Sequence, residues 1–316
     1  MNLRYLWIGS VIVLLYALLM SWNQDSARKK ELGEAAFIEQ IDVSQETPLQ
    51  ENSSLLVIEN EKLVVKISPV SGKVWEARLK EHTYLNNDDS LGVRVFGFDN
   101  LTGFRFYLSS GFVGEGGSFK VVNISPSSVE LLSEDGQVSK KISLKENDYE
   151  LFVTDTWVGG SLVDNPDPYV AMYRVDSKPL DSRGGFFENS SYTGVAFNTP
   201  ADPYVNSRLR SIDETQEFFQ RGGWIAFIQK YFMAAILTPP DREQTLSVIP
   251  PANETGVYVM AATSSGTKES ELREGIEHRI FLGPKIRSDL MTRASDLELT
   301  IDMGWFWFLA QPLVML

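Results

Sequence analysis

Few side chains in this chain are suited to catalysis or metal binding. The sequence has no cysteine and contains only two histidines, His82 and His278. The lack of cysteine excludes disulfides, thiolate metal sites, a cysteine nucleophile and a lipidated cysteine. Histidine is the usual acid–base group near neutral pH. Because these two are far apart in sequence, we expect both to be ordinary surface residues. A catalytic or metal site would therefore depend mainly on carboxylates.

The carboxylates do not form a recognisable metal-binding pattern. Asp164, Asp167, Asp176 and Asp181 lie close together in sequence, but they lack the alternating ligand spacing and the glycine of a calcium loop. The glycine-rich residues 114–117 are not followed by Lys-Ser/Thr, so they indicate a hairpin turn and not a phosphate-binding loop. We assign no catalytic, cofactor-binding or metal-binding residue from the sequence, and we expect no cofactor.

The composition limits the kinds of partner that the protein can bind. The chain has 316 residues, of which 43% are hydrophobic, and a formal net charge of −13. Such a charge repels phosphate, which excludes a general affinity for nucleic acid. The length is sufficient for one large β domain with additional segments.

An apolar stretch from Arg221 to Pro239 is predicted to be the core of that domain. It contains two short apolar runs, Trp224–Ile228 and Tyr231–Leu237, with Gln229-Lys230 between them. Gly222-Gly223 and Pro239-Pro240 are predicted to bound the two runs, and their short length favours strands over helix. We expect a buried hairpin or bent strand here.

The pattern of apolar and polar residues from Leu55 onward is typical of an antiparallel β-sandwich. Short apolar runs alternate with polar residues at a period of two, and turn residues such as Glu134–Gly136 and Glu146–Asp148 separate them. We therefore predict an all-β domain over residues 55–302. The predicted strands include Leu55–Ile58, Leu63–Ile67, Val93–Phe98, Phe104–Leu108, Phe119–Ile124, Val129–Leu132, Lys141–Leu144 and Leu151–Trp157.

The N-terminal region is predicted to be a membrane anchor. Residues 5–24 carry no charge, Leu14 and Leu15 occupy the apolar centre, and Trp7 and Trp22 lie near the two ends. This length suits a transmembrane helix, and aromatic residues prefer the two interfaces. A cleaved signal peptide would need a shorter apolar core and a small-residue cleavage site, so an uncleaved anchor is favoured.

Two segments flank the predicted anchor. Residues 1–4 form a short tail, and residues 25–54 are rich in Glu, Gln, Ser and Asp, which predicts a flexible tether. Charge counting does not establish the orientation, because Arg4 precedes the helix whereas Arg28, Lys29 and Lys30 follow it.

Several motifs, taken in order, resemble the periplasmic domain of YidC-type membrane protein insertases. The most specific is the last, where D-x-G-W-x-W-F-x-x-Q-P resembles the junction at which these insertases re-enter the membrane. The resemblance extends over essentially the whole chain. The motifs are Val70–Leu79 (V-S-G-K-V-W-E-A-R-L), Tyr192–Tyr204, Gly222–Phe232 (G-G-W-I-A-F-I-Q-K-Y-F), Phe281–Ile286 (F-L-G-P-K-I) and Leu297–Pro312 (L-E-L-T-I-D-M-G-W-F-W-F-L-A-Q-P).

The resemblance implies a fold, a location and a function. The fold would be a β-supersandwich similar to galactose mutarotases, preceded by one transmembrane helix. Residues 1–4 would be cytoplasmic, and the main domain would lie in the periplasm of a bacterium, anchored to the inner membrane. The function would be non-enzymatic: the anchor and periplasmic portion of an insertase or chaperone that assists insertion and folding of inner-membrane proteins. The implied partners are nascent inner-membrane proteins, components of the Sec translocon and the lipid bilayer.

Residues 303–316 are predicted to begin the return to the membrane. Trp305, Trp307, Phe308, Gln311 and Pro312 lie in an uncharged, aromatic run that is too short to span a bilayer. Such a run fits the lipid interface. The insertase machinery of the family would follow it, so we expect a fragment of a longer protein or a truncated product.

Two other functions remain open at this point. One is a membrane-tethered carbohydrate-binding or mutarotase-like module, which would require a carboxylate base and an imidazole acid at a sugar-binding cleft. The sequence shows no paired histidine and glutamate for that role. The other is an inert truncated product.

Overall fold

The computed structural model describes residues 55–82, 92–99, 104–113, 117–160, 162, 166–175, 194–251 and 257–301. All of them belong to the compact unit Pro48–Leu316. These residues are mostly in strands, which confirms the predicted all-β class. The strands are β1 Leu56–Glu59, β2 Leu63–Ile67, β3 Val74–Leu79, β4 Val93–Asp99, β5 Phe104–Phe112, β6 Phe119–Ser125, β7 Ser128–Ser133, β8 Val138–Leu144, β9 Glu150–Trp157, β10 Pro168–Val175, β11 Gly194–Phe197, β12 Val205–Arg208, β13 Gln216–Ile228, β14 Phe232–Ile249, β15 Tyr258–Thr263 and β16 Ile276–Pro284.

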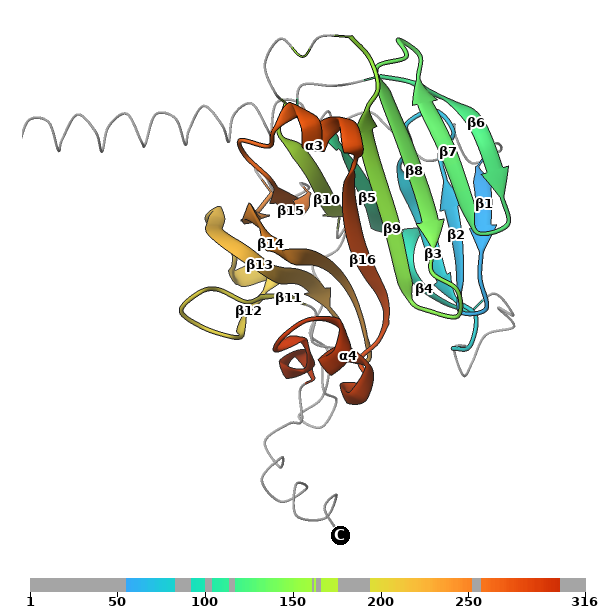
Figure 1. The fold of residues 1–316 in the computed structure, drawn as a ribbon. Helices are drawn as coiled ribbons and strands as arrows, with labels where there is room; N and C mark the ends of the chain where they lie inside the picture. Colours follow the sequence, from blue (N-terminus) through green and yellow to red (C-terminus); the bar gives the residue numbers. More distant parts are fainter. Residues whose placement is uncertain are drawn as a thin grey trace, which may run out of the picture. The chain divides into compact units, whose positions relative to one another are not determined.

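The strands form one antiparallel sheet that folds back on itself. Its order is β1-β2-β3-β4-β5-β10-β15-β14-β16-β9-β8-β7-β6, and β13, β11 and β12 extend from β14. In Figure 1, β6–β9 lie in front of β1–β4. The two layers are joined where Glu59 N donates to Pro126 O at 2.7 Å, next to β1 and the β6–β7 turn. The described part of the domain is therefore a sandwich closed by one continuous sheet.

The predicted hairpin is the centre of the core. β13 and β14 pair in antiparallel register from Gly223↔Thr238 to Ile228↔Met233. Every residue of Trp224–Ile228 and Met233–Leu237 is at most 2% exposed, which confirms the predicted burial. Tyr231, which the sequence suggested as the start of the second strand, lies instead in the turn and is 63% exposed.

The predicted boundaries of this hairpin are wrong. Both strands continue past Gly222-Gly223 and Pro239-Pro240, and a bulge separates the pair Gly223↔Thr238 from the pair Arg221↔Glu243. The prolines lie where the ladder is interrupted, so their missing N–H groups break no pairing. Gly222 has φ +67°, and a Cβ on it would come within 2.9 Å of Pro240 Cα. Glycine and proline here shape a bulge inside the strands and do not end them.

The remaining predicted elements are largely confirmed. Each strand expected from alternation in the described residues is present, and most are longer than expected. The turns at Glu134–Gly136 and Glu146–Asp148 are also present. A glycine reversal joins β2 to β3, with Gly72 at φ +64°. The helical elements are α3 Glu269–Glu274, α4 Arg287–Arg293 and the 3₁₀ turns Leu209–Ser211 and Leu297–Thr300 (η1 and η2).

No helix within the described ranges has the length and apolar character needed to cross a membrane. The predicted anchor, residues 5–24, and the predicted tether, residues 25–54, lie outside those ranges.

Candidate functional site

The site residues predicted from the sequence lie outside the described residues. This applies to the anchor residues Trp7, Leu14, Leu15 and Trp22, and to the interface residues Trp305, Trp307, Phe308, Gln311 and Pro312. The structure does describe the segment that leads to the second group. Residues 285–301, here called the junction segment, connect β16 to residue 302 and contain α4 and η2.

The junction segment has few means of folding on its own. α4 has only seven residues, fewer than an isolated helix needs in water. Local charges favour it, because Asp289 is in its first turn and Arg293 in its last. The Arg293 side chain also binds Asp289 one turn earlier, with Nη2 2.7 Å from Oδ1. Contacts with the sheet must supply the rest of its stability.

Apolar and polar contacts fix this segment to the β13–β14 hairpin. Leu290 and Leu297 are completely buried. Trp224 Nε1 donates to Ser295 O at 3.0 Å, so the central tryptophan of the core holds the loop after α4. Lys285 Nζ donates to Thr300 O at 3.1 Å, which ties the start of the segment to its end. The chain therefore reaches Ile301 along a fixed path.

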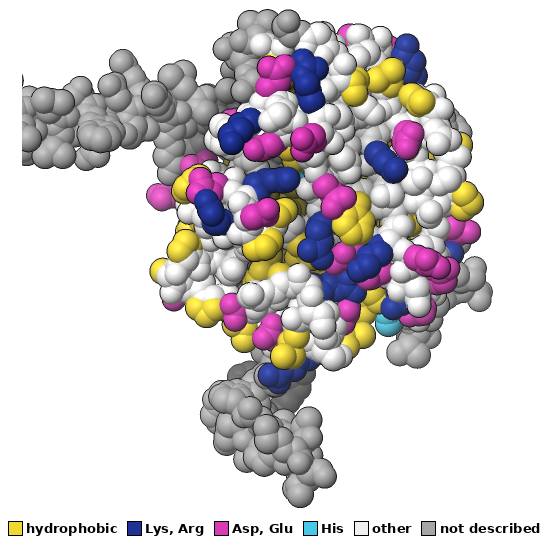
Figure 2. Space-filling view, in the orientation of Figure 1, with side chains coloured by type: hydrophobic (Ala, Val, Ile, Leu, Met, Phe, Trp, Pro, Cys, Tyr) yellow, Lys and Arg dark blue, Asp and Glu magenta, His cyan; other side chains and the backbone are white. Residues whose placement is uncertain are grey.

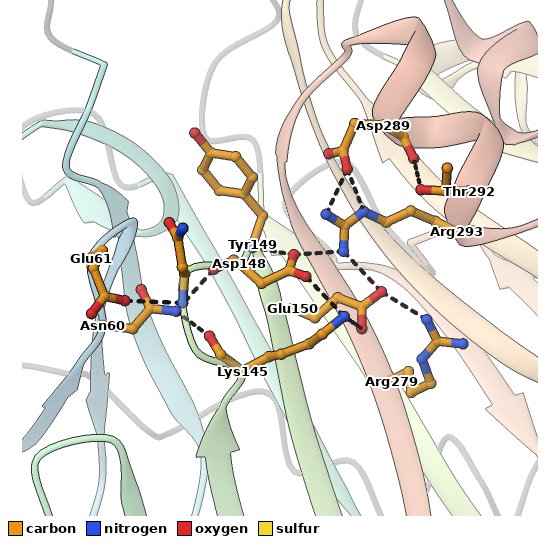
Figure 3. Close-up of polar contacts among 11 residues, drawn as sticks. Asn60, Glu61, Lys145, Asp148, Tyr149, Glu150, Arg279, Asp289, Thr292 and Arg293 are labelled. Atoms are coloured by element: carbon orange, nitrogen blue, oxygen red, sulfur yellow. Dashed lines mark hydrogen bonds and ion pairs between the residues drawn. The ribbon is translucent and has the colours of Figure 1, made fainter.

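The buried Arg293 is the centre of an ionic group that we call the junction cluster. Figure 3 shows its guanidinium between α4 and the start of β9. Nη1 is 2.6 Å from Asp148 Oδ1 and 3.0 Å from Glu150 Oε1. Two further cations complete the cluster, with Arg279 Nη2 2.7 Å from Glu150 Oε1 and Lys145 Nζ 2.9 Å from Asp148 Oδ2. The planar guanidinium thus binds carboxylates on two elements at once.

The charges in this cluster stabilise one another despite burial. Burial alone would raise the pKa of the Asp148 carboxyl, but hydrogen bonds from Lys145 and Arg293 outweigh it, and the pKa is lowered. Burial would likewise lower the pKa of Arg293, and the bonds to Asp289, Glu150 and Asp148 raise it instead. The Arg293 side chain is only 8% exposed. Asp148 and Arg293 therefore both stay charged at neutral pH, and the ion pair between them holds α4 against the sheet.

Tyr149 and His82 lie beside the junction cluster. Tyr149 Oη donates to Glu81 Oε2 at 3.0 Å, and His82 Nε2 is 3.4 Å from Tyr149 Oη. Burial, followed by the bond to Glu81, raises the pKa of Tyr149 to about 12. A phenol with that pKa is not a base at neutral pH.

A second ionic group, the interior cluster, lies between the two layers of the sandwich. It consists of Lys140 on β8, Asp155 on β9 and Ser110 on β5. Lys140 Nζ donates to Ser110 O at 2.8 Å, to Ser110 Oγ at 2.6 Å and to Asp155 Oδ1 at 2.5 Å. Ser110 Oγ donates in turn to Asp155 Oδ2 at 2.6 Å. The cluster joins β5 to the β8–β9 pair across the core.

This arrangement is not a catalytic one. A serine beside a lysine can serve as nucleophile and base, but an ammonium has three N–H donors, and here all three are engaged. Lys140 is 1% exposed and Asp155 0%, so a substrate has no access to them. Ser110 itself is 8% exposed. The interior cluster is a buried structural ion pair.

His278 is buried, which corrects the expectation of a surface histidine. It is 7% exposed, and its inward-facing position on β16 explains the burial. Its Nε2 has no hydrogen-bond partner. Burial, which outweighs the attraction of Asp155, lowers its pKa to about 4. The ring is therefore neutral at neutral pH.

The described residues contain no group of three His, Asp or Glu side chains that could hold a metal ion. Of the four aspartates considered for calcium, only Asp167 is described. It accepts hydrogen bonds from Ser265 Oγ and Gly266 N, both at 3.2 Å, within a loop contact.

The sequence contains a signal for the interior cluster. Lys140, Asp155, Ser110 and His278 each occupy an inward position in a strand whose alternate residues are apolar: Val138 and Ile142, Val153 and Trp157, Leu108 and Phe112, Ile276 and Ile280. A charged residue in the buried register of a strand indicates a partner across the core. The junction cluster has no such local signal, because Arg293 and Asp148 are far apart in sequence.

Comparisons with known proteins agree with the motifs. The model of the family described as "YidC periplasmic domain" matches residues 55–316. A membrane protein insertase YidC from Pseudomonas syringae pv. tomato is 28% identical over 289 residues, covering 85% of this chain and 51% of that protein. Another from Psychromonas ingrahamii is 29% identical over 280 residues, covering 83% and 48%. The chain thus spans about half the length of these curated relatives.

A search of solved structures found a galactose mutarotase-like protein from Lactobacillus casei, with a TM-score of 0.41 and 8% sequence identity, covering 73% of this chain and all of that one. The family match includes the core hairpin, both strands that carry the junction cluster and the junction segment itself. The chain belongs to the YidC periplasmic domain family.

Proposed function

We propose that this chain is the anchor and periplasmic portion of a membrane protein insertase that assists insertion and folding of inner-membrane proteins. The observation that carries the proposal is the family match over residues 55–316. The two relatives described above are both named as membrane protein insertases, and they extend to about twice the length that this chain matches. Partners on this proposal are nascent inner-membrane proteins, components of the Sec translocon and the lipid bilayer.

The proposed topology follows the sequence. Residues 1–4 are cytoplasmic, residues 5–24 form the transmembrane anchor with Trp7 and Trp22 at its ends, and residues 25–54 form the tether. Residues 55–302 are the periplasmic domain, and residues 303–316 begin the return to the inner membrane. Aromatic residues such as Trp305 and Trp307 suit the lipid interface.

The proposed fold is a β-supersandwich of the galactose mutarotase type, and the proposed role is non-enzymatic. Support for the fold comes from the sandwich-like sheet and from the motifs shared with the family. Support for the role comes from the chemistry of the described residues. The buried His278 has no hydrogen-bond partner at Nε2, and the ammonium of Lys140 is fully engaged.

The junction segment gives the domain a physical means of acting on the membrane. Because Trp224, Arg293 and Lys285 fix this segment to the sheet, the β domain holds the chain in a defined position as far as Ile301. A flexible linker here would leave that position undefined. The proposed domain thus positions the membrane region that follows it.

Topology is the first test of this proposal. Spheroplasts expressing the chain are treated with protease, and membranes are extracted with alkaline carbonate. We expect digestion of the domain beyond Ser54 from outside, with the anchor retained in the membrane fraction. Protection from protease, or release into the soluble fraction, would contradict the orientation or the anchor.

Complementation is the second test. A host depleted of its own insertase expresses either residues 1–316 or a chimera in which this chain replaces the matching half of the Pseudomonas syringae insertase. We expect the chimera to restore integration of a small dependent substrate and the chain alone to fail. Catalysed insertion needs a protected polar path through the bilayer, which one helix does not provide. Restoration by the chain alone would show that the activity belongs to the β domain and its anchor.

A further inference from the structure

Exposed apolar side chains gather around the junction segment. Tyr231 is 63% exposed, Ile286 48%, Met291 56% and Leu299 42%. We call these four residues the junction rim. They come from the β13–β14 turn, the start of α4, its outer side and η2, respectively.

Hydrogen bonds place three members of the rim close together. Lys285 N donates to Tyr231 O at 2.8 Å, and Ile286 is the next residue. Lys285 Nζ donates to Thr300 O at 3.1 Å, which brings Leu299 to the same corner. Met291 follows the buried Leu290 on α4 and is turned outward. Tyr231, Ile286 and Leu299 therefore lie at one corner of the domain, next to residue 301.

The rim also carries exposed positive charge. Lys230 and Arg287 are exposed, and no described residue forms an ion pair with either. Lys230 Nζ lies 5.0 Å from the centre of the Tyr231 ring. Within residues 285–301, Asp289 is bound to Arg293, and the other acidic side chains, Asp296 and Glu298, are half-buried. In Figure 2, hydrophobic side chains lie at the lower end of the domain, where Figure 1 places α4, with basic and acidic side chains among them.

We propose that the junction rim is a membrane-docking surface that rests on the periplasmic leaflet of an anionic phospholipid bilayer. Tyr231, Ile286, Met291 and Leu299 enter the headgroup level, and Lys230 and Arg287 bind lipid phosphates. Apolar side chains flanked by cations are the pattern of interfacial binding, and the long cationic side chains reach phosphate while their stems cover apolar surface.

The sequence that follows the rim indicates that the rim contacts a bilayer and not another protein. Leu299 in the rim is two residues from residue 301, and the uncharged, aromatic run with Trp305 and Trp307 begins within a few residues of it. The proposal therefore rests on the proposed function, in which residues 303–316 return to the membrane. It extends that function by assigning a lipid contact to the folded domain itself.

Depth measurement on the full chain in nanodiscs tests the proposal. The chain has no cysteine, so a single introduced thiol can carry an environment-sensitive nitrobenzoxadiazole label. Met291→Cys and Leu299→Cys report on the rim. Phe219→Cys is the matched control, because Phe219 is 66% exposed and lies near the other end of β13 from the Tyr231 turn. Val122→Cys on the edge strand β6, 62% exposed, is a second control.

In nanodiscs of phosphatidylethanolamine and phosphatidylglycerol, we expect both rim labels to emit at shorter wavelength and to be quenched by doxyl-labelled lipid. The control labels should show neither effect. Rim labels that behave like the controls would overturn the proposal, and equal quenching at all four positions would overturn it as well.

Two further measurements test the return of the chain to the membrane and the phosphate contacts separately. A label at Phe308→Cys reports on the return to the membrane. If it is quenched while the rim labels are not, the rim proposal alone fails, whereas loss of quenching at all three positions removes the proposed return to the membrane too. Lys230→Gln combined with Arg287→Gln should reduce quenching of the Leu299→Cys label, as should nanodiscs of phosphatidylcholine alone. Unchanged quenching in both cases would exclude the phosphate contacts.

Discussion

The interior cluster is fully buried, whereas the junction cluster buries Arg293 and its carboxylates but leaves the side chains of Arg279 and Lys145 34% and 51% exposed. Lys140 and Asp155 are at most 1% exposed, and each has a single opposite charge. In the junction cluster, Asp148 contacts Lys145 as well as Arg293, and Glu150 contacts Arg279 as well as Arg293. Removal of one charge therefore leaves an unpaired partner in the interior, but a still-paired partner at the junction.

This difference indicates different tasks. The interior cluster joins β5 to β8 and β9, strands that the sandwich brings together in any case. The junction cluster joins a seven-residue helix to the sheet, and that helix would not be stable otherwise. The first cluster supports the whole fold, and the second supports the position of one segment.

The largest expected effect is on the interior cluster. Lys140→Ala leaves the Asp155 carboxylate buried without an opposite charge, with only the hydrogen bond from Ser110 Oγ, and should lower the free energy of unfolding by about 3–5 kcal/mol. Denaturant titration of the full chain in detergent measures this. The double variant Lys140→Met/Asp155→Leu is the control, since it removes both charges, and it should cost far less. Equal losses in the two variants would show that packing, and not the unpaired charge, determines the cost.

A smaller loss is expected at the junction. Arg293→Ala leaves Asp148 with Lys145 and Glu150 with Arg279, so the loss should be about 1–3 kcal/mol, typical of hydrogen bonds to charged groups. Arg287→Ala, on the exposed side of the same helix, is the control and should change stability by less than about 0.5 kcal/mol. A cost at Arg293 as large as that at Lys140 would contradict the difference between the clusters.

Acid should weaken the interior region through His278. Its folded-state pKa is lowered from 6.5 to about 4, so the unfolded state binds the proton more strongly, and stability is lost as the pH falls between these values. From pH 7.5 to pH 5 the loss should be about 2 kcal/mol. Asp148, whose pKa is also lowered, contributes only at lower pH, because its starting value is 3.8.

Paired variants isolate this effect. His278→Gln should remove most of the loss between pH 7.5 and pH 5, whereas His82→Gln should retain it. Chemical unfolding at the two pH values is sufficient. The same pH dependence in wild type and His278→Gln would assign the acid sensitivity to other groups.

An exposed ion pair should contribute less to stability than either cluster. Arg221 Nη2 is 2.7 Å from Glu243 Oε1 beside the β13–β14 bulge, with side chains 62% and 54% exposed. Glu243→Gln should cost less than about 0.5 kcal/mol, since water and salt screen such pairs. A loss above 1 kcal/mol would mean that the bulge depends on this pair.

Local pattern was sufficient to predict most of the strands. Alternation of apolar residues located β1, β2 and β4–β9, and the core hairpin was evident from its two apolar runs. The boundaries of that hairpin were not predictable, because Gly222 and Pro239 can end a strand or shape a bulge, and only the pairing with the opposite strand decides between the two.

The long-range contacts could not be predicted from the sequence. Arg293 meets Asp148 and Glu150 only after β9 and α4 are packed together, and nothing near Arg293 in sequence indicates this. The burial of Lys140 and His278 was predictable from their inward register, but not the identity of their neighbours. The junction cluster therefore became apparent only in three dimensions.

Hydrogen exchange along the junction segment tests the claim that Arg293 fixes this segment to the sheet independently of the interior cluster. In the full chain in nanodiscs, Arg293→Ala should accelerate exchange of the amides in residues 287–300, while the amides of β13 and β14 keep their protection. Lys140→Met/Asp155→Leu should leave residues 287–300 protected as in the wild type. Unchanged exchange of the junction segment in Arg293→Ala, or equal acceleration throughout the domain, would contradict the claim.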